Sequence, residues 1–271
     1  MKKRDSPQRT LPRLATSPRR YASRRLAPRG EITCLLTLLV RGTYFPRQVI
    51  STALMVAWGM RLSIYLHARD TCADAAPPQL GARVLWSVVI SLPCVLCNTR
   101  QRDVFESTPV ELSGVAISIF CLLGETVADY EKHTWFKHAK KTSRPDRTST
   151  SAPVITNGWW HYSRNPNLFF EIMFHWGIYF IVKPVNSTLV VLTPLFNTFM
   201  IMHLPGGIRT REKERNKRFE LYPAYLSYRD STSPCFPMPP QVYDLLRRLG
   251  VPELYTETSS VNFPDYSVLD A

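Results

Sequence analysis

NGWWHYSRNPNLFFEIMFHWGIYF, residues 157–180, is the most informative stretch of this chain. It opens with a polar and aromatic turn and continues as an apolar run that we expect to be buried in lipid. A residue before proline avoids the helical conformation, and proline is favoured at the first position of a helix. We therefore predict that Asn165 ends a loop and that Pro166 begins a helix.

Three polar residues interrupt this apolar helix at a regular spacing. Asn167, Glu171 and His175 are each four residues apart, and residues at this spacing share one face of a helix. Ionisable side chains at membrane depth are costly and are therefore interpreted as functional by default. The polar stripe predicts a functional cavity inside the membrane.

The same stretch resembles the signature of the membrane steroid 5-alpha-reductase-like proteins, specifically the branch called the DUF1295 family. The family pattern is close to GLWxYSRHPNYFGE. The matching residues here are Trp160, Tyr162, Ser163, Arg164, Pro166, Asn167 and Glu171. Asn165 stands where the family usually has histidine, Leu168 where it has tyrosine, and Phe170 where it has glycine. The resemblance extends from about Trp58 to Pro240.

Two further elements carry the same resemblance. AWGMRLSIYLHAR is similar to the family's WGxRLxxYLxxR element, and GETVADYEK is similar to its GExxADxxK element. The resemblance implies that Arg61, Glu125 and Asp129 line the cofactor pocket. The residues themselves leave simpler alternatives open. Arg61 could extend to the membrane interface, and Asp129 could form an ordinary ion pair with Lys132 on a solvated helix face.

The apolar runs predict an all-α fold: a polytopic helical membrane bundle of the steroid 5-alpha-reductase/isoprenylcysteine methyltransferase type. A membrane-spanning helix needs about 20 residues, and we expect roughly five or six membrane-embedded segments. The main candidates are residues 48–66, 84–97, 110–128, 157–180 and 186–204. Residues 31–40 are apolar but too short, and the family has more helices before this point, so the N-terminus is expected to be abbreviated. Residues 70–83 and 137–153 are predicted loops.

The two ends of the chain differ from its middle in composition. The first 30 residues hold ten Lys or Arg and one acid, Asp5, which is +9 of the formal +13. This composition is typical of an organelle transit peptide and equally of a basic disordered tail. No aromatic residues alternate with the charge, so we expect no nucleic-acid partner. Residues 31–240 form the predicted membrane domain, and residues 241–271 a C-terminal tail.

The cysteines and the soluble-enzyme motifs argue against other classes of site. Cys94 and Cys97 form a CxxC inside an apolar stretch, without a second pair or a histidine partner. We interpret them as small buried hydrophobic residues and expect no metal site. A GxGxxG after a strand and an HExxH are both absent, so neither a soluble dinucleotide fold nor a zinc protease is indicated.

A charged segment closes the family-like region. IRTREKERNKRFE, residues 208–220, predicts a helix on which Arg211 and Arg215 share a face with Phe219. The alternative is a merely solvated amphipathic helix. With the following YPAYLSY and TSPCFP strings, this segment resembles the family's ending.

The resemblance implies NADPH-dependent reduction of a C=C bond conjugated to a ketone, in a steroid-like or other lipid substrate. Phosphate groups need arginine or lysine partners, and Arg61, Arg164 and Arg211 are the candidates. The amide of nicotinamide needs a polar partner with donor and acceptor character, or a carboxylate. Asn167 and Glu171 suit this role.

The signature adds Tyr162 to the implied cofactor site. Negative charge on the enone oxygen must also meet an acid or a hydrogen-bond donor. In the reductase relatives a Tyr–Glu pair from the early helices supplies it. Trp58 occupies the neighbourhood where that tyrosine is expected, which leaves Tyr65 as the candidate catalytic residue.

Two other functions remain open from the sequence. One is an S-adenosylmethionine-dependent membrane methyltransferase of the isoprenylcysteine carboxyl methyltransferase type, which shares an RHPxY-type motif. The other is a non-catalytic membrane protein on the same scaffold, suggested by the departures in the signature and the short N-terminus. In each case the expected location is the endoplasmic reticulum or another organelle membrane, in contact with the lipid bilayer.

Overall fold

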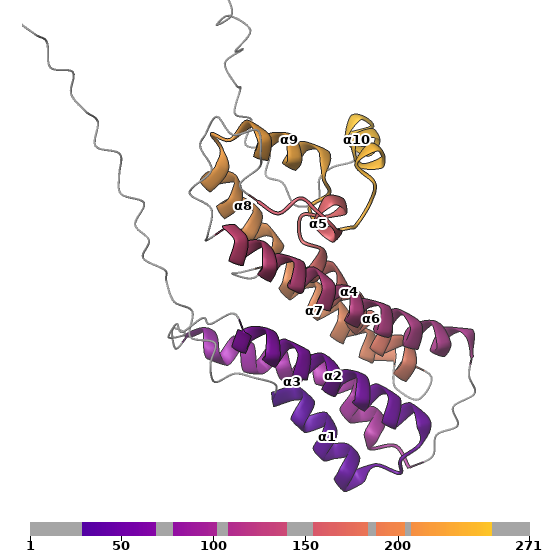
Figure 1. The fold of residues 1–271 in the computed structure, drawn as a ribbon. Coiled ribbons are helices and arrows are strands. Elements are labelled where there is room, and N and C mark those ends of the chain that lie inside the picture. The colour runs from indigo at the N-terminus through magenta and orange to yellow at the C-terminus, as the bar shows by residue number, and fades with distance from the viewer. Residues whose placement is uncertain are drawn as a thin grey trace, which may run out of the picture.

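The computed structural model describes residues 29–68, 78–101, 108–139, 154–183, 188–203 and 207–250. Within these ranges the regular structure is helical and contains no strand, so the predicted all-α class is confirmed (Figure 1). The helices, in chain order, are α1 (Arg29–Arg41), α2 (Pro46–Ala68), α3 (Pro78–Asn98), α4 (Pro109–Ala139), α5 (Trp159–Tyr162), α6 (Pro166–Val182), the 3₁₀ helix η2 (Thr188–Val191), α7 (Leu192–His203), α8 (Ile208–Phe219), α9 (Pro223–Ser231) and α10 (Pro240–Arg248).

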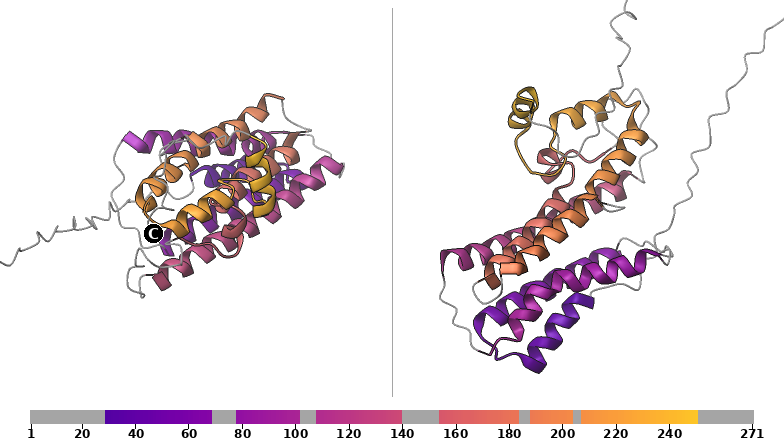
Figure 2. Two further views of the ribbon diagram at one scale, coloured as in Figure 1. Left: turned by 90° about the horizontal axis from the view of Figure 1, so that it is seen from above. Right: turned by 180° about the vertical axis from the view of Figure 1, so that it is seen from behind.

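The helices form two layers and an end cap. Helices α1, α2 and α3 pack on one another, and α4, α6 and α7 form the second layer (Figures 1 and 2). Helix α4 lies along α6 over most of its length, and α2 and α3 contact α6 from the other layer. Helices α5, α8, α9 and α10 lie together beyond one end of these layers. The predicted signature stretch therefore joins the bundle to its cap.

Two buried ion pairs hold α2 and α4 in parallel register. Arg47 pairs with Glu111, and Arg61 pairs with Glu125. Both arginines and both glutamates are 14 residues apart, nearly four helical turns, so the pairs lie on one face about 21 Å from each other. Breaking a buried pair by removing one partner typically costs about 3–5 kcal/mol. A shift of either helix by one turn would break both.

The first of these glutamates also begins α4. The Thr108 backbone N–H donates to Glu111 Oε2 at 3.0 Å, and the Glu111 N–H donates to Thr108 Oγ1 at 3.4 Å. This reciprocal pair is a capping box, which satisfies two donors that a helix start leaves without partners.

Small residues allow α4 and α6 to approach closely. A Cβ added at Gly114 would lie 2.8 Å from the carbonyl oxygen of Gly177, and one added at Gly177 would lie 2.9 Å from that of Gly114. The Ser118 hydroxyl of α4 donates to the carbonyl of Phe174, which lies one turn before Gly177 on α6, at 3.5 Å. Close backbone contact through small residues is characteristic of helix pairs in membranes.

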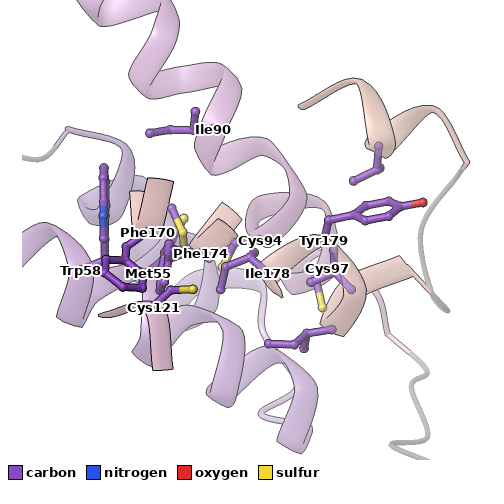
Figure 3. Close-up of a cluster of buried hydrophobic side chains, with 14 residues drawn as sticks. Met55, Trp58, Ile90, Cys94, Cys97, Cys121, Phe170, Phe174, Ile178 and Tyr179 are labelled. Atoms are coloured by element: carbon purple, nitrogen blue, oxygen red, sulfur yellow. The ribbon is translucent and has the colours of Figure 1, made fainter. Parts of the chain in front are cut away.

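A buried apolar cluster fills the space between the two layers (Figure 3). Met55 and Trp58 of α2 meet Phe170, Phe174 and Ile178 of α6 there. The cluster also contains Cys94, Cys97 and Cys121, which are buried and not in disulfide bonds. The prediction that the CxxC cysteines are core residues is confirmed. Cys72 lies outside the described residues.

Several predicted boundaries need correction. Helix α3 begins at Pro78, inside the predicted loop 70–83, because proline suits the first position of a helix. Helix α4 continues to Ala139, three residues into the predicted loop 137–153. The short apolar run at 31–40 forms α1. The basic segment 1–28, the segments 69–77 and 140–153, and residues 251–271 lie outside the described part of the chain.

Within the described part of the chain, two segments are long and apolar enough to cross a membrane: Pro109–His138 and Leu189–Phe219, the latter passing over residues 204–206, which are not described. A shorter apolar helix covers Leu85–Asn98. The two long segments agree with the predicted spans 110–128 and 186–204, and the shorter helix coincides with the predicted apolar run 84–97. Together they support a membrane protein in general terms.

Candidate functional site

The signature turn is held by a distant segment of the chain. Ser163 forms an isolated bridge with Ser233, and the Arg164 N–H donates to the Ser233 carbonyl at 2.8 Å. The Ser163 hydroxyl donates to the Cys235 carbonyl at 2.7 Å, and the Met238 N–H donates to the Tyr162 carbonyl at 3.1 Å. The TSPCFP string is therefore the structural partner of the WxYSR string.

Helix α6 begins where the sequence predicts. Asn165 caps it with φ −140° and ψ 58°, and Pro166 occupies the first turn. The Asn165 amide Nδ2 donates to Glu212 Oε1 at 2.8 Å and to the Pro234 carbonyl at 2.9 Å, and its Oδ1 accepts from Arg215 Nη2 at 3.1 Å. A neutral imidazole has one donor and one acceptor, so the family's histidine could not make all three bonds.

The first polar group lies where α2, α4 and α6 meet, and we call it the Arg61 cluster: Arg61, Glu125, Asp129 and Asn167. Arg61 Nη2 pairs with Glu125 Oε1, and Arg61 Nη1 lies 2.6 Å from Asp129 Oδ2. Asn167 Nδ2 donates to Asp129 Oδ1 at 3.2 Å. Trp58 Nε1 donates to the second oxygen of Glu125 at 3.2 Å. One guanidinium therefore joins two carboxylates, and an amide from α6 completes the group.

Glu171 lies beside this cluster, and it interacts electrostatically with Arg61, Arg211 and Asp129. Its side chain is half-buried. Arg211 of α8 thereby links the cap to the stripe on α6. The formal charges of Arg61 and Arg211 against Glu125, Asp129 and Glu171 leave the region negative by one.

The predicted polar face of α6 contains two acceptors without partners among the described residues. Oδ1 of Asn167 is buried and accepts no hydrogen bond. The same is true of Nε2 of His175, whose Nδ1 bonds to the Glu171 carbonyl at 2.9 Å. Buried polar atoms are paired in the great majority of native structures, so each exception calls for an explanation such as a bound ligand or water.

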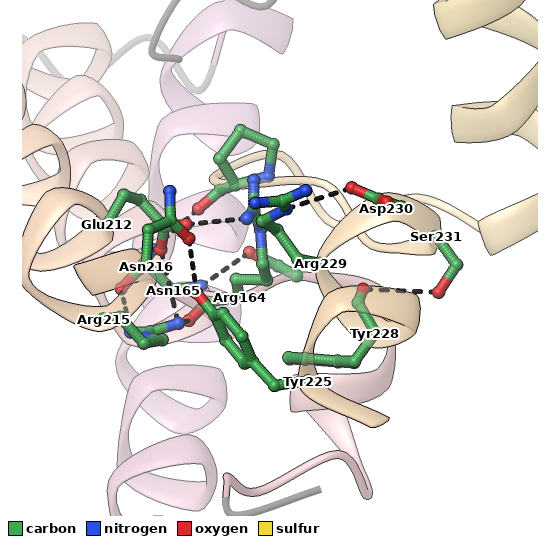
Figure 4. A network of polar contacts seen from close by, with 12 residues as sticks. Arg164, Asn165, Glu212, Arg215, Asn216, Tyr225, Tyr228, Arg229, Asp230 and Ser231 are labelled. Carbon is green, nitrogen blue, oxygen red and sulfur yellow. Dashed lines mark hydrogen bonds and ion pairs between the residues drawn. The ribbon is translucent and has the colours of Figure 1, made fainter. Parts of the chain in front are cut away.

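The second polar group joins the signature turn to α8 and α9, and we call it the Arg164 cluster: Arg164, Asn165, Glu212 and Arg215 (Figure 4). Arg164 is fully buried, with Nη1 2.8 Å from Glu212 Oε2. Arg215 Nη1 lies 3.3 Å from Glu212 Oε1 and also donates to the Arg164 carbonyl at 3.2 Å. A single glutamate thus receives two arginines and an asparagine.

Two tyrosines of α9 close this second cluster. The Tyr225 hydroxyl donates to Asn216 Oδ1 at 2.6 Å, and the Tyr228 hydroxyl donates to the Trp160 carbonyl at 2.5 Å. Burial raises the pKa of Tyr225 to about 12 and raises the pKa of Tyr228 as well. Burial also raises the pKa of the Cys235 thiol to about 12. These groups stay neutral at physiological pH, as donors inside a packed interface.

The structure separates the predicted site residues into groups. Glu125, Asp129, Asn167 and Arg61 are in direct contact, with Glu171 and Arg211 at electrostatic range. The remaining predicted residues are Arg164 in the second cluster, Tyr162 with 42 % of its side chain exposed, and Tyr65 on α2, one turn beyond Arg61.

The alternative partner for Asp129 can now be compared with the observed one. Asp129 pairs with Arg61, whereas Lys132 Nζ lies 4.9 Å from the centre of the Trp160 ring. The interior face of α4 therefore carries Asp129 toward α2. Sequence reasoning missed Glu212, which appears only as one acid in a basic helix. Its signal is the three-residue spacing to Arg215.

Comparison with known families decides the relationship. The sequence pattern of the family described as "Protein of unknown function (DUF1295)" matches residues 79–232, more than half of the chain. The chain belongs to the DUF1295 family. The matched DUF1295 region runs from α3 to α9 and includes both polar clusters apart from Arg61 and its helix. No curated protein and no solved structure matches the chain.

Proposed function

We propose that this DUF1295 protein is a polytopic integral membrane protein of the endoplasmic reticulum or another organelle. The support is a set of apolar ridges on the outer faces of its helices. The exposed residues are Leu85, Val88, Leu92 and Leu96 on α3, Leu112, Ile119, Leu123 and Val127 on α4, and Leu192, Leu195 and Phe199 on α7. Soluble monomers rarely expose contiguous apolar patches of this kind, whereas lipid tails would cover them.

We further propose that the protein is an NADPH-dependent oxidoreductase that reduces a C=C bond conjugated to a ketone in a steroid-like or other lipid substrate. The observation that carries this proposal is the meeting of Arg61, Asp129 and Asn167, from three different helices, inside an apolar bundle. Charged groups at such a depth are costly and are retained chiefly for function. Membership of the DUF1295 family agrees with the reductase resemblance but does not name an activity.

The residues present fit a nicotinamide group. The unpartnered Oδ1 of Asn167 can accept an amide N–H, and the carboxylate of Glu171 can accept another. Arg61 is already neutralised by two carboxylates, so its role is to hold Glu125 and Asp129 in place rather than to bind phosphate. Arg211 is the nearest candidate for a phosphate contact. When bound, NADPH would supply the hydride.

The chain must also stabilise the charge that develops on the ketone oxygen. Trp58 cannot replace the relatives' tyrosine here, because its N–H is already donated to Glu125. Tyr65 remains the proposed donor, since it follows Arg61 by one turn on α2 and presents a phenolic O–H. The apolar walls around the stripe, formed by Trp58 and Phe174, would exclude water from the reacting atoms.

Ligand-dependent stability distinguishes the three possible functions. Purified full-length protein should be stabilised by NADPH and not by S-adenosylmethionine, by about 2.7 kcal/mol at a ligand concentration 100 times Kd. The stabilisation should be lost in Asn167→Ala and kept in Thr126→Val, a matched change on the exposed face of α4. Stabilisation by S-adenosylmethionine alone would establish a methyltransferase instead, and no effect of either cofactor would leave a non-catalytic membrane protein.

A further inference from the structure

Two histidines in the structure make the same local bond but differ in their surroundings. His175 Nδ1 bonds to the carbonyl four residues earlier, at 2.9 Å from Glu171 O, and His203 Nδ1 does the same at 3.1 Å from Phe199 O. A carbonyl can only accept, so in both residues Nδ1 carries the proton. In the neutral ring Nε2 is then an acceptor. For the exposed His203 water can satisfy it, whereas His175 is only 5 % exposed.

Aromatic rings surround the buried histidine. The Trp58 ring lies 4.9 Å from the His175 ring at 84°, and the Phe174 ring lies 5.3 Å away, also at 84°. The Trp58 N–H donates to Glu125 and therefore does not donate to Nε2 of His175. Among the described residues Nε2 of His175 has no hydrogen-bond partner. An unpaired buried acceptor destabilises the folded state unless something else donates to it.

A second acceptor without a partner among the described residues indicates which ligand chemistry this face could bind. Oδ1 of Asn167 and Nε2 of His175 belong to the same face of α6, eight residues apart, which is about 12 Å along the helix axis. Glu171, between them, adds a carboxylate that also accepts. This face therefore offers acceptors at both ends and in the middle. A molecule that lies along it has to bring its own donors.

We infer that His175 Nε2 accepts a hydrogen bond from a hydroxyl group of the lipid substrate. The inference rests on the proposed function, because it specifies a group of that substrate. Asn167 stands at the start of α6, near the charged cap, where the amide of the cofactor is proposed to bind. His175 lies two turns deeper, between the rings of Trp58 and Phe174, so its proposed partner is an apolar molecule with one donor. Ketones, ethers and esters carry no donor and would leave Nε2 unpaired.

Matched alcohols and methyl ethers test this inference. The purified full-length protein is incubated with phosphatidylcholine vesicles that contain a 3β-hydroxysterol, octadecanol or a polyprenol, or the methyl ether of each. Retained lipid is then quantified by native mass spectrometry. At least one alcohol should be retained about 3- to 10-fold more than its ether, the range expected for one neutral hydrogen bond. The inference is overturned if the wild type prefers none of the three alcohols.

Variants of the histidine show whether that preference arises at Nε2. His175→Gln should keep the preference, because the glutamine Oε1 is an acceptor near the position of Nε2. His175→Phe and His175→Leu should lose it, and His203→Phe should behave as wild type. A preference that persists in a folded apolar variant would refute the inference. NADPH stabilisation is measured in parallel, so that loss of the cofactor effect alone counts against the reductase proposal and not against the hydroxyl contact.

Discussion

The Arg61 and Arg164 clusters share several residue types, but their side chains bond to different kinds of partner. Each contains an arginine, a glutamate and an asparagine; Arg164 is fully buried and Arg61 is partly buried. In the Arg164 cluster the side chains bond to backbone carbonyls of the turn and the closing segment, at Arg164 and Pro234. In the Arg61 cluster they bond only to other side chains. Buried atoms without a hydrogen-bond partner in the described part of the chain adjoin both clusters: Asn167 Oδ1 and His175 Nε2 on α6, and the guanidinium nitrogens of Arg164.

This difference indicates different roles. Bonds to backbone carbonyls join segments that are far apart in the chain, so the Arg164 cluster acts mainly as a structural connector between the signature turn, α8 and α9. The unpaired nitrogens of Arg164 belong to a side chain that is ion-paired with Glu212, whereas the two unpaired atoms on α6 are neutral acceptors, and this is why we propose a ligand there. We therefore propose that the sequence signature has a structural half, around Arg164 and Asn165, and a binding half, around Asn167 and Glu171.

The largest expected effect is on the structural half. Arg164→Met should lower the free energy of unfolding by about 3–5 kcal/mol. Glu212 would stay buried but would lose its ion pair with Arg164. Chemical denaturation of the purified protein in detergent measures this. Arg218→Met, an exposed change on α8 that removes a cation–π contact with Phe219, should change stability by less than about 1 kcal/mol. Equal effects of the two substitutions would contradict a connecting role for Arg164.

The binding half should respond in affinity rather than in stability. Glu171→Gln removes the charge that can accept the nicotinamide amide, and a charge-assisted hydrogen bond contributes about 1.5–3 kcal/mol. NADPH affinity should therefore fall by about 10- to 100-fold, measured by titration calorimetry, while membrane insertion is retained. Unchanged affinity in this variant would argue against the assigned role. Glu214→Gln on the exposed face of α8 is the matched control.

Restoring the family's histidine tests the connector from another side. Asn165→His keeps one donor and one acceptor but loses a bond, so we expect a loss of about 1–3 kcal/mol in the free energy of unfolding. NADPH affinity should remain within about twofold, because the substitution touches the structural half. A large loss of affinity without a loss of stability would erase the distinction between the two halves.

The smallest expected change in stability is at Tyr225 of α9. Tyr225→Phe should cost about 0.5–1.5 kcal/mol near neutral pH, the contribution of one neutral hydrogen bond. Because burial raises the pKa of Tyr225 to about 12, the neutral form is favoured in the folded state. Its contribution is present below the unfolded pKa of about 10 and is lost as pH rises toward 12. In urea titrations from pH 9 to 12, the free energy of unfolding should decrease less steeply with pH in the variant than in the wild type.

Local rules account for what could be predicted. The Asn165-Pro166 boundary, the stripe of Asn167, Glu171 and His175, and the charged helix α8 follow from proline geometry and from four-residue spacing. These features depend on backbone conformation within one helix, which short-range sequence controls. The start of α3 was misplaced because prolines at 77 and 78 suit a loop and a helix N-terminus equally, and neighbouring helices decide between them.

The partners across the fold were beyond such rules. The sequence alone established an all-helical chain, the apolar and polar faces of its central helix, and the residue types of a candidate site, because a helix repeats every 3.6 residues whatever surrounds it. Tertiary packing assigned Arg61 to Glu125 and Asp129, Arg164 to Glu212, and the TSPCFP segment to the signature turn. These contacts join residues 48 to 72 positions apart, and their pairing depends on how whole helices pack rather than on any local pattern.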